Sequence, residues 1–216
     1  MSEPTKTGRF IALEGGEGAG KSTQAALLRD ALLQNGQEVV LTREPGGTRG
    51  AEAIRNLLLD PPMAEGWGAE AEALLFAAAR SDHVSKRIKP AMERGAWVIC
   101  DRFVDSSRAY QGGAGKLGDE IIQSLHQIGS DGIRPDLTLL FELDEERMVE
   151  RLAQRDGDQS DAIGGRGREY HRAVAAQFRV LADADPAGFA LVDANGSADQ
   201  VHQLVWAAIN PLLGGV

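Results

Sequence analysis

A glycine-rich segment near the start of the chain has the residue types and spacing of a phosphate-binding loop. Residues 15–22 read Gly-Gly-Glu-Gly-Ala-Gly-Lys-Ser and fit the pattern G-x-x-x-x-G-K-[ST]. Glycines permit a backbone in which successive N–H groups face one anion, the lysine adds a point charge, and the serine hydroxyl is a magnesium ligand. The residues expected to hold the phosphates of ATP are therefore Gly15, Gly16, Glu17, Gly18, Ala19, Gly20, Lys21 and Ser22.

An acidic residue follows a second apolar run further along the chain. Residues 97–100 read Trp-Val-Ile-Cys, and Asp101 comes directly after them. In proteins with a phosphate-binding loop, such an acid holds magnesium, usually through water. We therefore predict that Ser22 and Asp101 form the magnesium site, although a solvated aspartate at a strand end is the alternative. Asp144 follows another apolar run and is better interpreted as the N-cap of the next helix.

Apolar runs that alternate with helical patterns must position these residues. We expect strands at residues 10–14, 39–42, 96–100, 137–143 and 189–192. We expect helices at residues 22–35, 48–59, 69–94, 119–128, 145–153, 169–184 and 198–213, the third of them broken near Lys89 because Pro90 follows. This order predicts an α/β fold with a parallel sheet of about five strands and helices on both faces, and ligands at the carboxyl ends of the strands.

Length and composition limit the classes of protein that this chain can belong to. Its 216 residues suggest a single domain, 1–216, and 43% hydrophobic with 25% charged residues is ordinary for a globular protein. A net charge of −9 disfavours non-specific nucleic-acid binding. The polar N-terminal residues 1–9, the lone Cys100 and the lack of a bilayer-length apolar run lead us to expect a cytoplasmic protein without a membrane partner.

Arginines are placed where a second anion could be bound. Residues 154–168 are rich in Gly, Asp and Arg without apolar periodicity, which predicts a mobile lid over the phosphates. The arginines near the lid are Arg151, Arg155, Arg166 and Arg168, and those near predicted strand ends or on helices lining the cleft are Arg43, Arg80, Arg102 and Arg108. A small kinase needs such groups to hold its acceptor and to exclude water. For each arginine alone, the alternative is a solvated surface charge.

Two other classes use the same phosphate-binding loop. A GTPase reads guanine with an Asn-Lys-x-Asp segment, which the sequence lacks. A nucleotide-binding switch or regulatory ATPase stays open as an alternative, and it would bind or hydrolyse ATP without responding to an acceptor.

Several further stretches, taken in order along the chain, resemble the thymidylate kinase family, bacterial type. They are residues 14–22, 42–48, 74–80, 101–103, 106–113, 134–138 and 191–194. The resemblance implies a nucleoside monophosphate kinase fold, ATP and Mg²⁺ as donor and cofactor, and phosphorylation of dTMP to dTDP for dTTP synthesis. It also implies a homodimer. A kinase for another nucleoside monophosphate or a deoxynucleoside is the close alternative.

The resemblance assigns roles to three residues around the acceptor's base and sugar. Glu17 is expected to accept a hydrogen bond from the 3′-hydroxyl of dTMP. Phe76 is expected to stack on thymine, where an aromatic ring supplies apolar area. Arg80, one turn further along the same helix face, is expected to donate to a thymine carbonyl. For Phe76, a core position on a helix face is the alternative.

The resemblance also assigns residues to the dTMP phosphate and to the rest of the pocket. Arg102 is expected to hold the dTMP phosphate, because a planar fork suits an anion. Tyr110 is expected to crowd the sugar's 2′ position and so to disfavour ribonucleotides. Ser107 and Gln111 are expected to line the base and sugar pocket, and Arg43 to shape the acceptor site.

The lid departs from the family pattern at one position. Bacterial members usually have Asp-Arg, an apolar residue and an acid, whereas residues 161–164 read Asp-Ala-Ile-Gly, so the expected arginine is missing at Ala162. Losing such an arginine can cost about three to five powers of ten in rate. Either this enzyme is slow or another arginine substitutes; our hypothesis is that Arg155 with Arg166 supplies the charge. The predicted catalytic residues are then Lys21, Asp101, Arg102, Arg155 and Arg166.

Overall fold

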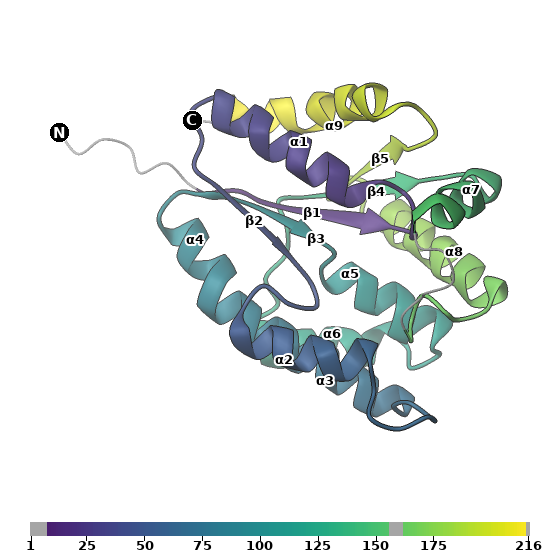
Figure 1. Cartoon of the computed structure of the whole chain (residues 1–216). Helices are drawn as coiled ribbons and strands as arrows, with labels where there is room; N and C mark the ends of the chain where they lie inside the picture. Colours follow the sequence, from purple (N-terminus) through teal and green to yellow (C-terminus); the bar gives the residue numbers. More distant parts are fainter. Residues whose placement is uncertain (1–7, 156–161, 215–216) are drawn as a thin grey trace.

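The computed structural model describes residues 8–155 and 162–214, and it contains a single-layer sheet of parallel strands (Figure 1). The strands are β1 (Phe10–Gly15), β2 (Val39–Arg43), β3 (Trp97–Asp101), β4 (Leu137–Glu142) and β5 (Phe189–Asp193). They lie in the order β2-β3-β1-β4-β5, and every neighbouring pair is parallel. The α/β fold and the five-stranded parallel sheet predicted from the sequence are therefore confirmed.

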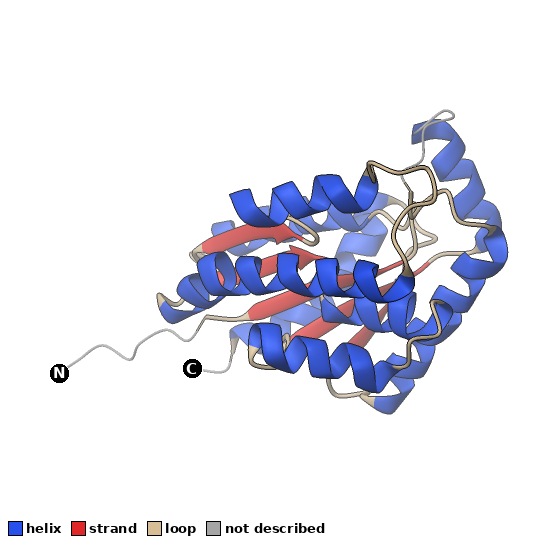
Figure 2. Ribbon diagram, turned by 90° about the horizontal axis from the view of Figure 1, so that it is seen from below, coloured by secondary structure: helices blue, strands red, loops and turns tan. Residues whose placement is uncertain are grey.

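Helices cover both faces of the sheet. They are α1 (Lys21–Gln34), α2 (Arg49–Leu59), α3 (Ala69–His83), α4 (Lys89–Glu93), α5 (Val104–Ser107), α6 (Asp119–Ser130), α7 (Glu145–Arg155), α8 (Arg168–Ala184) and α9 (Ala198–Leu213). Figure 1 shows α1 and α9 on one face and α3 to α6 on the other, and Figure 2 views the strands from the side of this second face.

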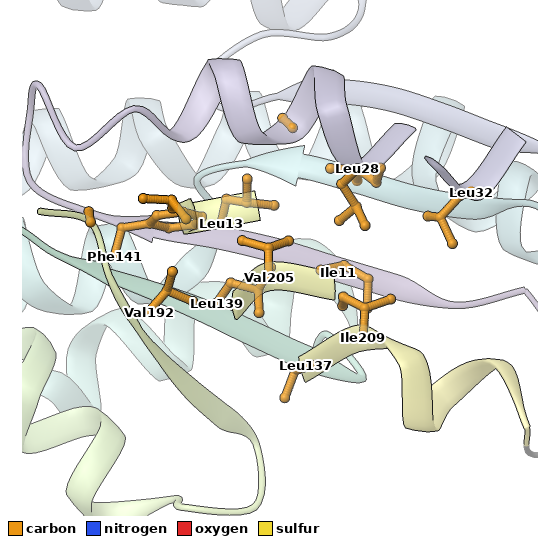
Figure 3. Close-up of a cluster of buried hydrophobic side chains, with 14 of the residues drawn as sticks. Ile11, Leu13, Leu28, Leu32, Leu137, Leu139, Phe141, Val192, Val205 and Ile209 are labelled. Carbon is orange, nitrogen blue, oxygen red and sulfur yellow. The ribbon is translucent and has the colours of Figure 1, made fainter. Parts of the chain in front are cut away.

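The core is divided by the sheet because successive strand residues point to opposite faces. On β1, Ile11 and Leu13 pack toward α1 and α9, where they meet Leu28 and Val205 (Figure 3). The intervening Phe10 packs on the opposite face, with residues of α3 and α4. Both faces of the strand are buried, which explains why its sequence is a continuous apolar run.

The helical connections agree with the sequence prediction in one place, the break before Pro90, and differ from it in another. The long helix expected at 69–94 is interrupted by a π-helical segment, Val84–Ile88, directly before α4, and Pro90 occupies the second position of α4. The segment after β3, to which the pattern assigned no element, is helical: α5 leads into a π-helical segment, Arg108–Ala114. The helical structure of this segment affects the site, because the segment carries residues predicted to bind the acceptor.

Each helix in the described part of the chain is too short or too polar to cross a lipid bilayer.

Candidate functional site

The predicted phosphate-binding loop connects β1 to α1 at the carboxyl edge of the sheet. Gly15, Gly18 and Gly20 all have positive φ angles, 133°, 70° and 81°, which side chains rarely tolerate. At Gly15 a Cβ would also lie 2.4 Å from the carbonyl oxygen of Phe141. The loop therefore needs glycine at these places, and its tight path brings the eight predicted residues together around the start of α1.

The Lys21 ammonium group is folded back onto this loop. Its Nζ donates to the carbonyl oxygens of Gly15 and Gly16, at 3.1 and 2.7 Å. Burial, together with the charge of Arg102, lowers the pKa of Lys21 to about 7, although nearby carboxylates oppose the shift. A phosphate group bound by the loop would supply the missing negative charge, so the charged lysine is favoured when the donor nucleotide is present.

Ser22 and Asp101, the two predicted magnesium ligands, are direct neighbours. The Ser22 hydroxyl donates to the Asp101 carboxylate at 2.7 Å. Both are oxygen ligands, which magnesium prefers, and the described residues contain no group of three or more His, Cys, Asp or Glu side chains that could hold a metal alone. Such a pair fits an ion that the protein shares with nucleotide phosphates.

A cavity of about 100 Å³ lies beside the phosphate-binding loop. Its walls come from the loop, from α2 and α3, from the helical segment after β3, and from Ile163 at the end of the lid. The acceptor-site residues that the sequence placed together and that line this cavity are Glu17, Phe76, Arg80, Arg102, Ser107, Tyr110 and Gln111. Ligand pockets usually measure about 300–1,000 Å³. The cavity must therefore widen to admit a nucleotide.

Arg43, which we expected to shape the acceptor site, does not line this cavity. It is the last residue of β2, its side chain is exposed, and it donates to the Glu52 carboxylate at 3.2 Å. Strand alternation explains this, because buried Thr42 points inward and the next side chain points away. Arg55 of α2 lines the cavity instead and donates to the Pro45 carbonyl at 2.8 Å. A basic residue on the cleft face of α2 was the signal available in the sequence.

Arg108 also lies outside this cavity. Its guanidinium donates to Asp105 at 2.9 Å and to both carboxylate oxygens of Asp119, at 2.7 and 2.8 Å. These contacts connect the segment after β3 to α6. Arg108 therefore stabilises the walls of the site rather than facing a ligand.

Arg102 is half-buried at the floor of the cavity and has a strained backbone. Its φ angle is 69°, it donates to the Ser106 hydroxyl at 3.1 Å, and its guanidinium carbon lies 5.3 Å from the centre of the Tyr110 ring. Burial alone would lower the pKa of Arg102, but the facing Tyr110 and carboxylates outweigh it and raise this pKa above its ordinary value. The guanidinium is therefore always charged and available to an anion.

Glu14 holds the segment that carries Arg102, a role that the sequence analysis missed. Its buried carboxylate accepts from the backbone N–H groups of Phe103 and Ser106, at 2.8 and 3.0 Å, and from the Ser106 hydroxyl at 2.6 Å. Burial raises the pKa of Glu14 to about 7, and the Arg102 charge opposes that shift. The contacts link the end of β1 to the turn after β3.

The end of the lid is docked onto the acceptor side. Arg166 donates to the Glu72 carboxylate and, at 2.6 Å, to the Tyr170 hydroxyl. At Gly164, where the family pattern has an acid, a Cβ would lie 2.9 Å from Oε1 of Glu17, so glycine allows the lid backbone to approach this carboxylate. The side chain of Arg155, the other predicted lid charge, lies outside the described residues.

A third arginine, Arg151, donates hydrogen bonds to the phosphate-binding loop and to the segment after β5. Arg151 of α7 donates to the carbonyl oxygens of Gly18, Ala194 and Gly196, at 3.3, 3.0 and 3.3 Å. It thereby connects the phosphate-binding loop to the segment that follows β5. Arg151 does not line the acceptor cavity.

Comparison with known proteins gives a consistent result. The family model described as thymidylate kinase matches residues 13–205. A protein named thymidylate kinase from Rhizorhabdus wittichii is 53% identical over 206 residues, which is 95% of this chain and 99% of the relative. Thymidylate kinases from a Bradyrhizobium species and from Rhodopseudomonas palustris are 44% and 45% identical, over 95% and 94% of this chain and 91% and 88% of the relatives.

Proposed function

Because this chain belongs to the thymidylate kinase family, and is thus a nucleoside monophosphate kinase, we propose that its described site transfers the γ-phosphoryl group of ATP to dTMP. The products are ADP and dTDP. The observation that carries this assignment is that Glu17 of the phosphate-binding loop and Arg102 line one cavity together with groups suited to stacking on a base and hydrogen bonding to it. Donor and acceptor sites therefore meet at the loop itself.

The donor phosphates bind the backbone N–H groups of residues 15–20 and the Lys21 ammonium group. Ser22 and Asp101 would hold Mg²⁺, and the bound ion would neutralise charge on the donor phosphates. Catalysis of this reaction consists mainly of positioning and of charge stabilisation, since the protein forms no covalent bond. The proposed function assigns residues 1–216 to a single P-loop domain, with the predicted lid at residues 154–168.

The acceptor phosphate binds Arg102, with Arg55 as a second cationic group from α2. Glu17 accepts a hydrogen bond from the 3′-hydroxyl of the sugar. Tyr110 crowds the 2′ position, so a ribonucleotide is disfavoured.

The thymine base stacks on Phe76 and receives a hydrogen bond from Arg80. Ser107 and Gln111 complete the pocket. Gln111 also donates to Glu72 at 2.8 Å, and Glu72 binds Arg166, so one carboxylate connects the base pocket to the lid.

A panel of nucleoside monophosphates with ATP tests this function. We expect kcat/KM for dTMP to exceed that for UMP and AMP by more than tenfold. We expect kcat/KM for dUMP to be about 10–200-fold below that for dTMP, because one methyl group separates the two nucleotides. Comparable turnover of UMP or AMP would exclude the thymidylate assignment. ATP hydrolysis that does not respond to dTMP would instead favour a nucleotide-binding switch.

The exposed apolar residues of two neighbouring helices support a homodimer. Leu74 on α3 and Ile121 and Ile128 on α6 are 57%, 51% and 83% exposed. Burying such side chains is favourable by about 1.5–3 kcal/mol each. We expect light scattering to give the mass of two chains and Ile128→Asp to give that of one; a monomeric unmodified protein would contradict the proposal. The reaction belongs in the cytoplasm, and we expect neither a nucleic-acid nor a membrane partner.

A further inference from the structure

A buried polar cluster borders the acceptor cavity, and the reaction as described above uses Arg80 but neither Glu44 nor His83. Its centre is Glu44, which directly follows β2, and its other members include Arg80 and His83 of α3. The three residues are 5%, 3% and 0% exposed. Burying charged groups costs more free energy than pairing them usually returns. Stability is therefore a poor explanation for this cluster.

Two acceptors fix the orientation of the Arg80 guanidinium. Its Nε donates to Oε2 of Glu44 at 2.8 Å, and its NH2 donates to the Ser107 hydroxyl at 2.8 Å. Bonds from two different nitrogens leave the planar group no freedom to rotate. Among the described residues, these two acceptors bind Nε and NH2 of Arg80 and not NH1. The NH1 group can therefore donate to a molecule in the cavity that Arg80 lines.

His83 holds Glu44 from the other side. Oε1 of Glu44 lies 3.0 Å from Nδ1 of His83, and Nε2 of the same ring lies 2.7 Å from the Thr42 hydroxyl. Because a carboxylate only accepts, Nδ1 carries the proton, and in the neutral ring Nε2 accepts from Thr42. Each carboxylate oxygen of Glu44 therefore has one assigned donor.

The turn after β2 is shaped around this cluster. The backbone N–H of Glu44 donates to the Asp101 carbonyl at 2.9 Å, which ties the turn to β3. At Gly47, with a φ angle of 87°, a Cβ would lie 2.5 Å from both the His83 ring and the Thr42 hydroxyl. The turn closes tightly over the histidine, and this fixes the position of the Glu44 carboxylate.

We propose that Glu44, supported by His83, is a positioning residue that determines base specificity. It holds Arg80 so that the remaining N–H groups face a carbonyl acceptor of the pyrimidine. Thymine and uracil have a carbonyl where cytosine has an amino group, and two donors cannot pair. A fixed Arg80 rejects the amino base, whereas a mobile one can turn away from it. This inference rests on the proposed function, in which Arg80 reads the base.

The test uses dTMP together with dUMP and dCMP, whose bases differ at this carbonyl or amino group and in the proton on the neighbouring ring nitrogen N3. We expect the unmodified enzyme to favour dUMP over dCMP by at least about 100-fold in kcat/KM, since unpaired donors at a built site are strongly rejected. Glu44→Ala lowers this ratio at least tenfold. Glu44→Gln, which keeps one oxygen for Arg80, restores most of it.

Further variants keep the outcome decisive. Glu44→Asp keeps the charge but moves the carboxylate away from Arg80, so it should also lower the ratio of kcat/KM for dUMP to that for dCMP. This variant tests the inference if Glu44→Ala does not fold. Glu38→Gln, an exposed carboxylate paired with Arg94 on the surface, leaves the ratio unchanged. An equal loss of kcat/KM for all three substrates in folded variants would show a merely structural role and overturn the inference. An unmodified enzyme without preference for dTMP over UMP and AMP would refute the proposed function instead.

Discussion

We expect the replacement of Arg102 by alanine to lower kcat/KM for dTMP by about 30- to 5,000-fold, because removing one partner of a hydrogen-bonded charge pair costs about 2–5 kcal/mol. The guanidinium lies half-buried on the floor of the acceptor cavity and keeps its charge. Its removal would leave the acceptor phosphate beside the Glu17 carboxylate without a cation to balance the two negative charges. Part of the loss should appear in KM for dTMP, and KM for ATP should change less.

Two comparisons show whether geometry or mere charge is responsible. Arg102→Lys keeps the charge but loses the planar fork, so it should recover only part of the activity. Arg43→Ala removes an arginine from the end of β2, close in the fold but pointing outward to Glu52, and should change kcat/KM by less than about threefold. A fully active lysine variant, or an equally damaged Arg43 variant, would contradict our placement of the acceptor phosphate.

The sheet was predictable because its information is local. Each strand is a short apolar run, and the chain reaches the carboxyl edge at Gly15, where the glycine pattern begins. The segment after β3 was not predictable in the same way. Its helical turns, Val104–Ser107 and Arg108–Ala114, are held by long-range contacts such as that between Glu14 and Phe103, which are 89 residues apart. Local periodicity contains no trace of such a contact.

The site shows the same division between local and long-range information. The phosphate-binding loop is contiguous, so its spacing alone predicted that these eight residues hold phosphates. Arg43 and Arg55 were harder to assign, because whether a side chain at a strand end or on a helix faces the cleft depends on tertiary packing. Glu44 and Arg80, 36 residues apart, could be paired only in the folded chain. Supporting residues were missed, while those that contact substrate were inferred from the family resemblance.

The lid arginines give the second large effect. We expect Arg166→Ala and Arg155→Ala each to lower kcat at least tenfold, about 1.4 kcal/mol of transition-state stabilisation. The reason for this expectation is that the chain has Ala162 where the family pattern has a lid arginine, so the transferred phosphoryl group lacks the positive charge of that arginine. Ala162→Arg should accordingly raise kcat. An unchanged or lower rate would show that this position is not where charge is lacking.

The contact between Arg166 and Glu72 allows a sharper test of how the lid acts. In the structure Arg166 is paired with Glu72 and lies over the Tyr170 ring, 4.8 Å from its centre. If Arg166 stabilises the transferred phosphoryl group, it must leave Glu72 first, and Glu72→Gln should weaken the competing pair and maintain or raise kcat. If the pair itself holds the lid on the acceptor, Glu72→Gln should lower kcat as much as Arg166→Ala does. Single-turnover rates for the two variants and for the double variant separate these roles, because additive losses would show that the residues act independently.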